Sequence, residues 1–225
     1  MIAYHGKPEV KELYLDRVRA HRAADELVKG NYWEGGKGCA VGCTIHGSSH
    51  KKYETELGIP VALARLEDVI FERLPNGKAM EWPERFLLAP KVGADLALVW
   101  NRFAHWLLVD ETYGVIRYAK TDQQREAIQA VAALHKRTID GDSVTAPEWA
   151  AAAAYAAAYA AAAAAYAAAY AAAAAYAAAA AAAYAAAYAA ADAATAYAAA
   201  AASAAAREHA WIRMSDKLIQ LMEAA

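Results

Sequence analysis

The chain has 225 residues and a formal net charge of -2, without any long basic or acidic block, so nucleic acid and anionic membrane surfaces are not its expected partners. Residues 1–142 have ordinary globular composition and are long enough to bury a core, whereas 145–225 form an alanine-rich tail. The opening MIAYHGKPEV has no apolar signal-peptide core, so we expect a cytoplasmic protein.

Residues 1–142 are predicted to form a compact helical head, which makes the expected fold class all-α. Apolar periodicity, prolines at helix starts and glycines at helix ends define the elements. In chain order, the predicted helices cover 8–30, 39–46, 60–74, a short segment opening at Trp82-Pro83, 94–109 and 121–139. Between Leu107 and Ala119 the pattern changes to LLV, DETYG and VIRYA, which favours a small β-hairpin around Gly114.

The tail has its own helix-start signal. Thr145 is placed to cap a helix whose first turn contains Pro147 and Glu148. No glycine, proline or asparagine follows up to Ala225, so one long helix is predicted, with Asp192 or Ser203 as the places where it would fold back. The Leu, Ile, Val and Phe that drive membrane insertion are absent from 150–191, so no membrane span is expected.

Tyrosines form a stripe along this predicted helix, several of them eleven residues apart. The stripe contains Tyr155, Tyr159, Tyr166, Tyr170, Tyr176, Tyr184 and Tyr188. Such an uncharged aromatic surface favours contact with another copy, with a helical protein partner or with the head itself. The amphipathic end, 207–225, presents Trp211, Leu218 and Met222 as a docking face, or it completes the core of the head.

The chemical candidate in the head is a C-x3-C-x2-H-x3-H pattern of zinc-ligand types, formed by Cys39, Cys43, His46 and His50. One unbroken helix would spread these residues over about 16 Å, so the turn at Gly47 must return His50 to the cysteines, or His21 must complete the set. Alternatively, the glycine-rich segment before Cys39 holds an anion, or lowers the pKa of that thiol and makes it reactive.

The plainer alternative treats both cysteines as small core residues of a helix that Gly38 and Gly42 allow to pack closely. The nearby Glu67, Asp68 and Glu72 form an acidic patch beside two arginines, which is typical of a solvated helix face. Neither a nucleotide-binding Gly-Lys-Ser/Thr motif nor a di-iron Glu-x-x-His motif occurs. No catalytic residue is assigned, and a non-enzymatic protein is favoured.

Three segments of the head, GKGCAVGCTIHGSSHKKYETELGIP, ARLEDVIFERLPN and EWPERFL, resemble a group of uncharacterised bacterial and phage proteins. Those proteins combine such a head with an alanine-rich C-terminal helix, punctuated by arginine, aspartate and tryptophan where this chain has mainly alanine with tyrosine at intervals. The resemblance implies an all-helical prokaryotic protein and transfers no activity.

Two functional hypotheses follow from the sequence. The first is a helical assembly or interaction protein whose tyrosine-striped helix packs against a partner helix or another copy. The second is a metal-binding or thiol-active head centred on Cys39, Cys43, His46 and His50, with zinc as the cofactor.

Overall fold

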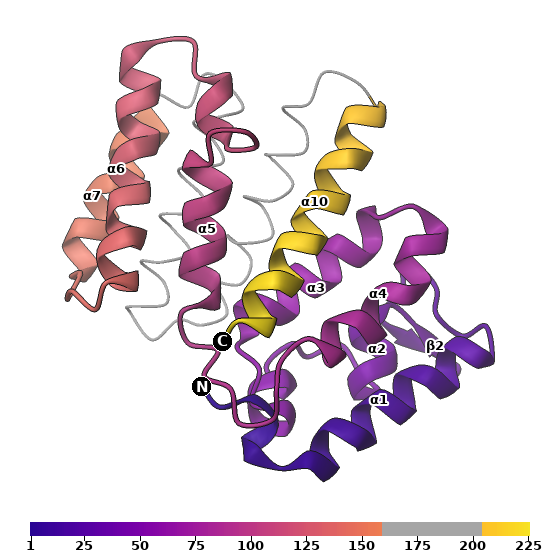
Figure 1. Ribbon diagram of the computed structural model, residues 1–225. Helices are drawn as coiled ribbons and strands as arrows, with labels where there is room; N and C mark the ends of the chain where they lie inside the picture. Colours follow the sequence, from indigo (N-terminus) through magenta and orange to yellow (C-terminus); the bar gives the residue numbers. More distant parts are fainter. Residues whose placement is uncertain (159–203) are drawn as a thin grey trace. The chain divides into compact units, whose positions relative to one another are not determined.

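Figure 1 shows a computed structural model of the chain, in which residues 1–158 and 204–225 are described. The described residues are mostly helical with one two-stranded antiparallel hairpin, so the predicted all-α class is confirmed. The chain divides into two compact units, Met1–Ala97 with Trp211–Ala225 (unit 1) and Leu98–Ala210 (unit 2). This division differs from the predicted boundary at residue 142, because the last helices of the predicted head pack with the start of the tail helix.

The elements of unit 1 follow one another through short loops. They are η1 (Ala3–Gly6), α1 (Pro8–Ala23), β1 (Trp33–Glu34), β2 (Lys37–Gly38), α2 (Ala40–Ile45), η2 (Tyr53–Leu57), α3 (Val61–Arg73) and α4 (Asn76–Leu88). Helix α1 packs against α2 and α4, and α3 packs against the same two helices. The buried side chains of these helices, including Trp82, Phe71 and Phe86, form the apolar core of the unit.

In unit 2, helix α6 packs against both α5 and α7. Its described elements are α5 (Val99–Val109), η3 (Val115–Tyr118), α6 (Asp122–Ile139) and α7 (Ala146–Ala158). Phe103 of α5 and Ile128 of α6 are fully buried. Helix α6 begins as predicted, because the Thr121 hydroxyl accepts a hydrogen bond from the Gln124 amide at 3.2 Å.

The hairpin lies at residues 33–38 and not at 107–119, where the sequence placed it. Gly35 and Gly36 connect the strands with φ of 57° and 85°, the left-handed turn that favours two-residue hairpins. At 107–119 the chain instead continues α5 to Val109 and then turns, because the Asp110 carboxylate accepts hydrogen bonds from the next amides. Side-chain capping therefore replaces strand pairing in this segment.

Two helices are shorter than predicted, because the residues expected at one end of each form backbone hydrogen bonds with other segments instead. Helix α1 stops at Ala23, and residues 26–28 pair with Gly38 beside β2. Helix α5 starts at Val99, because residues 94–96 exchange hydrogen bonds with Met1 and Ala3. Helix α4 begins at Asn76 and continues through Pro83, so that proline does not open a helix.

The tail helix begins where the sequence predicts. Helix α7 starts at Ala146, and the Glu148 carboxylate accepts hydrogen bonds at 2.7 Å from the amide and the hydroxyl of Thr145. Arg137 of α6 donates to the same carboxylate at 2.6 Å. Tyr155 is exposed, and its hydroxyl donates to Glu126 of α6 at 3.3 Å. The other predicted tyrosines, Tyr159, Tyr166, Tyr170, Tyr176, Tyr184 and Tyr188, lie outside the described residues, as do Asp192 and Ser203.

The C-terminal helix α10 (Ala204–Glu223) ends inside unit 1. Its predicted docking residues Trp211, Leu218 and Met222 are buried, and Asp216 forms an ion pair with Arg85 of α4 at 3.0 Å. These three residues therefore fit the alternative prediction, in which the C-terminal segment completes the core of the head instead of presenting a docking face. Within the described part of the chain, no helix is long and apolar enough to cross a bilayer.

Candidate functional site

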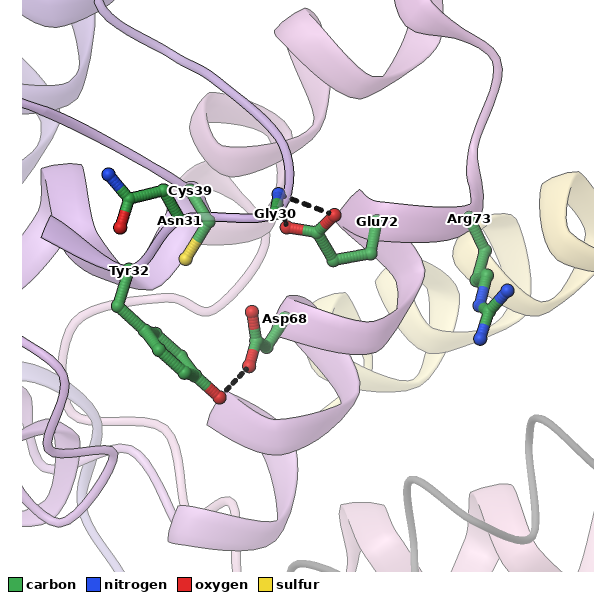
Figure 2. A pocket seen from close by; sticks show the side chains of 7 residues that line it. All are labelled: Gly30, Asn31, Tyr32, Cys39, Asp68, Glu72 and Arg73. Atoms are coloured by element: carbon green, nitrogen blue, oxygen red, sulfur yellow. Dashed lines mark hydrogen bonds between the residues drawn. The ribbon is translucent and has the colours of Figure 1, made fainter.

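A cavity of about 380 Å³ opens in unit 1 beside the hairpin and the last two turns of α3. Figure 2 shows that its side chains come from two sides, one from the loop and helix start around residues 30–39 and one from α3. The lining residues are Gly30, Asn31, Tyr32, Cys39, Asp68, Glu72 and Arg73. The cavity thus joins a thiol, a phenol and two carboxylates in one place.

The glycines of the hairpin segment bring the loop carrying Tyr32 against α2. A Cβ at Gly38 would lie 2.0 Å from the Tyr32 carbonyl oxygen, and a Cβ at Gly42 would lie 1.4 Å from it. Any side chain at these positions would push the loop away, so the close packing expected of these two glycines is confirmed. The Cys39 amide then donates to the Asn31 carbonyl at 2.7 Å, which fixes the thiol beside the loop.

Asp68 is the centre of the polar cluster. Its Oδ2 accepts hydrogen bonds from the Tyr32 hydroxyl at 3.0 Å and from His50 Nε2 at 2.9 Å, and the Cys39 thiol also donates to this carboxylate. His50 is 1% exposed, and its ring meets the Tyr32 ring edge-on. Burial, together with the Asp68 charge, raises the pKa of Tyr32 to about 12, so the phenol remains a hydrogen-bond donor at neutral pH.

Glu72 lies one helical turn beyond Asp68 and faces the same cavity (Figure 2). Its two carboxylate oxygens accept from the Gly30 amide at 3.1 and 3.0 Å. Burial raises the pKa of this carboxyl, and the nearby Asp68 raises it further. One potential ligand atom from each of Cys39, Asp68 and Glu72 lies within 4.8 Å of the others, so side chains of metal-ligand type from two separate segments converge here.

The environment of both thiols raises their pKa and therefore disfavours the nucleophilic thiolate. Burial raises the pKa of Cys39, and the Asp68 charge adds to this effect despite opposing hydrogen bonds from the amides of Gly42 and Val41. Burial likewise raises the pKa of Cys43 to about 12. The expectation that Lys37 and the helix start lower the pKa of Cys39 is therefore wrong, because desolvation outweighs the backbone amides.

The four predicted zinc ligands and His21 divide into separate groups. Cys39 and His50 meet at Asp68, so the Gly47 turn does return His50 toward Cys39, with a carboxylate between them. His46 instead contacts His21, with 2.8 Å between their Nε2 atoms. The Cys43 thiol donates to the Gly38 carbonyl at 3.3 Å, which is a local contact between α2 and the end of β2.

Two of the three acidic residues of α3 are buried and Glu72 is partly exposed, which corrects their interpretation as a solvated face. Glu67 is fully buried and Asp68 is 7% exposed. The Glu67 carboxylate accepts a hydrogen bond from the buried Tyr53 hydroxyl. Asp68 and Glu72 are the site residues that the sequence interpretation missed, and the available signal was their i, i+4 spacing on a helix predicted to pack against the cysteine segment.

No family model, curated protein or solved structure matches this chain. The resemblance to bacterial and phage proteins therefore stays a prediction from the sequence.

Proposed function

We propose that unit 1 binds a divalent transition-metal ion, with Cys39, Asp68 and Glu72 as its protein ligands and Zn²⁺ as the best-matched ion. The single observation that supports this function is the convergence of these three ligand atoms within 4.8 Å at the wall of a cavity. A thiolate and two carboxylates are all established zinc ligands. Three protein ligands would leave a further coordination position for water or a small molecule in the cavity.

The distances require only a modest contraction. Zinc bonds of about 2.3 Å to sulfur and 2.0–2.2 Å to oxygen place tetrahedral ligand atoms roughly 3.3–3.6 Å apart. The ligand atoms lie within 4.8 Å of one another, so the widest separation must shorten by at most about 1.5 Å, a change within reach of side-chain rotations. The two carboxylates supply negative charge that favours a divalent cation, and Arg73 is the cation among the residues that line the cavity.

The proton state of Cys39 supports a metal ion over covalent thiol chemistry. With its pKa raised by burial and by Asp68, the free thiol keeps its proton at neutral pH. A coordinated cation reverses this preference, since it stabilises the thiolate directly. Metal binding should accordingly release a proton. His50 and Tyr32 donate hydrogen bonds to the Asp68 carboxylate and hold it in place, as residues just outside the ligand shell of a metal commonly do.

The test is a calorimetric titration of the chelator-treated full chain with Zn²⁺. We expect a Zn²⁺ site in the wild type whose affinity falls in Cys39→Ser by more than the roughly 100-fold that removing an outer partner costs. Cys43→Ser is the matched control, because Cys43 is also a buried thiol and its serine can keep the hydrogen bond to Gly38. No Zn²⁺ binding by a folded wild type, or equal losses in both variants, would contradict the proposal.

Assembly through the tyrosine stripe is a separate prediction of the sequence. Of its tyrosines only Tyr155 is described, and its ring is exposed with the hydroxyl directed to Glu126 of the same unit. Sedimentation of the full chain over a wide concentration range tests this prediction. A mass that stays monomeric throughout would argue against self-association.

A further inference from the structure

A second group of metal-ligand side chains lies in unit 1, away from Asp68. His21 stands in the last turn of α1, and His46 is the residue that ends α2. Their rings are nearly perpendicular, and the two Nε2 atoms face each other across 2.8 Å. His46 is exposed, so an ion in solution can reach the gap between the rings.

Glu26 fixes the tautomer of His21. Its carboxylate lies 2.5 Å from His21 Nδ1, which makes that nitrogen the donor and leaves the lone pair of Nε2 directed at His46. A histidine that donates Nδ1–H to a carboxylate and presents Nε2 outward is the arrangement that orients metal-binding imidazoles in proteins. The pair therefore already has the outer partner that a metal site needs.

Trp33 and the backbone fix the second imidazole. The Trp33 ring stacks on His46 with 4.6 Å between centroids and 17° between planes, and it meets the His21 ring edge-on. His46 itself has a φ of 49° and a ψ of 55°, in the left-handed region that glycine usually occupies at a helix end. A strained histidine held by a stacked ring is an outlier of the kind that clusters at functional sites.

We propose that His21 and His46 form a two-imidazole site for a borderline divalent cation such as Ni²⁺, Cu²⁺ or Zn²⁺. Metal–nitrogen bonds of about 2.0–2.1 Å would place the two Nε2 atoms roughly 3.3 Å apart, so insertion needs them to separate by only about 0.5 Å. His46 moves its proton to Nδ1 when the cation takes its Nε2. The remaining coordination positions face solvent, and imidazole nitrogen selects these late transition metals over Mg²⁺ or Ca²⁺.

The surrounding charges are mixed and favour a neutral, metal-ready His46. Desolvation lowers the pKa of His46, and the positive charges of Arg17 and Lys52 lower it further. Arg17 is directed to the Thr44 carbonyl and Lys52 forms an ion pair with Glu56. The Glu26 carboxylate supplies negative charge on the other side of His21. This site is independent of the one at Asp68 and shares no ligand with it.

The experiment isolates this site by using the full-length Cys39→Ser chain and Ni²⁺ as the probe. Calorimetry should detect one Ni²⁺ site, weakened at least about tenfold in Cys39→Ser/His46→Asn, since asparagine tolerates the left-handed backbone but removes the imidazole. Cys39→Ser/His5→Asn is the matched control, because His5 is also a left-handed histidine and is exposed. Equal Ni²⁺ affinity in all three proteins would overturn the proposal.

A spectroscopic measurement distinguishes the loss of an imidazole ligand from a loss of folding. Electron paramagnetic resonance of Cu²⁺ bound to Cys39→Ser should report two imidazole nitrogens, and adding His21→Gln should leave one. Circular dichroism must show that each variant retains its helices. A Cu²⁺ spectrum with the same nitrogen count in both folded proteins would contradict the assignment.

Discussion

Unit 1 and unit 2 bury different kinds of side chain. Among the described residues, unit 1 buries four histidine or charged side chains, His50, Arg65, Glu67 and Asp68, whereas unit 2 buries only His135. Three of the four come from a single helix, α3, whose other buried residues are apolar. Burial of charge costs free energy, so a fold that places charged groups together in one core gives up stability there.

Under our proposal, this difference separates the unit that binds a metal ion from the unit that is packed for stability. In unit 2 the buried surfaces of α5 and α6 are almost entirely apolar, and the ion pairs Arg137–Glu148 and Lys136–Asp140 lie on its exterior. In unit 1 the buried Asp68 lines a cavity, and the buried His50 contacts its carboxylate. Four predictions, which use five substitutions, test this contrast.

The largest effect is expected from Phe103→Ala in unit 2. Phe103 is fully buried, so its loss should lower the free energy of unfolding by about 3–5 kcal/mol through lost burial and a cavity. Chemical denaturation measures this cost. Zn²⁺ affinity, measured where the variant is folded, should be unchanged because Phe103 does not line the cavity. A loss of Zn²⁺ binding in the folded variant would contradict the claim that only unit 1 determines Zn²⁺ affinity.

A buried histidine in each unit provides a matched pair. His50→Phe removes the donor to Asp68 and should weaken Zn²⁺ binding by about 10–100-fold, as loss of an outer partner does. His135→Phe removes the contact between Nδ1 and the Asn101 amide oxygen, and should cost about 1–3 kcal/mol in stability without changing Zn²⁺ affinity. Calorimetry and denaturation of both variants check the pair. Similar Zn²⁺ affinities in the two variants would remove the distinction between the units.

We expect the buried Glu67 of unit 1 to make the stability of the protein depend on pH. Burial raises the pKa of this carboxyl well above 4.5, so its contribution to stability is full below the unfolded pKa and is lost as pH rises toward the folded pKa. Glu67→Gln keeps an acceptor for Tyr53 and removes the ionisation. Relative to wild type, the variant should therefore gain stability between pH 5 and pH 8. Parallel stability curves over that range would show that Glu67 does not titrate with folding.

The smallest effect is expected at the exposed start of α7 in unit 2. Here stability is lost as pH falls, whereas the contribution of Glu67 is lost as pH rises. The Thr145 amide and the side chains of Arg137 and Thr145 lower the pKa of Glu148 to about 2. Its stabilising contribution is thus present above pH 4.5 and is lost as pH falls toward 2. Glu148→Gln should flatten this acidic limb of the thermal midpoint. An unchanged limb would mean that the capping contacts are not maintained in solution.

The helical framework was predictable where local signals are complete. The turn at Pro75 ends α3, and the Thr121–Gln124 pair starts α6, so both helices appear at the predicted places. The hairpin at 33–38 was missed because its strands have only two residues each and show no alternation, although Gly35-Gly36 carried the turn signal. The early end of α1 depends on backbone pairing with Gly38, a long-range contact that periodicity does not encode.

The candidate site was predictable in part. The pattern of cysteines and histidines indicated Cys39 and the turn that returns His50, but spacing along the chain does not specify which side chains meet. Asp68 and Glu72 resemble surface residues by charge alone, and only the packing of α3 against α2 turns them inward. The close approach of Tyr32 to Gly42 likewise has no signal beyond the glycine itself.

The most direct measurement of the central claim is the absorption spectrum of the Co²⁺-substituted full chain. Co²⁺ accepts the same ligands as zinc, and a coordinated thiolate adds a charge-transfer band. The proposed site predicts this band in wild type and in Cys43→Ser, and its absence in Cys39→Ser. A spectrum without the band in the wild-type protein, or a band that persists in Cys39→Ser and disappears in Cys43→Ser, would contradict a metal site at Cys39, Asp68 and Glu72.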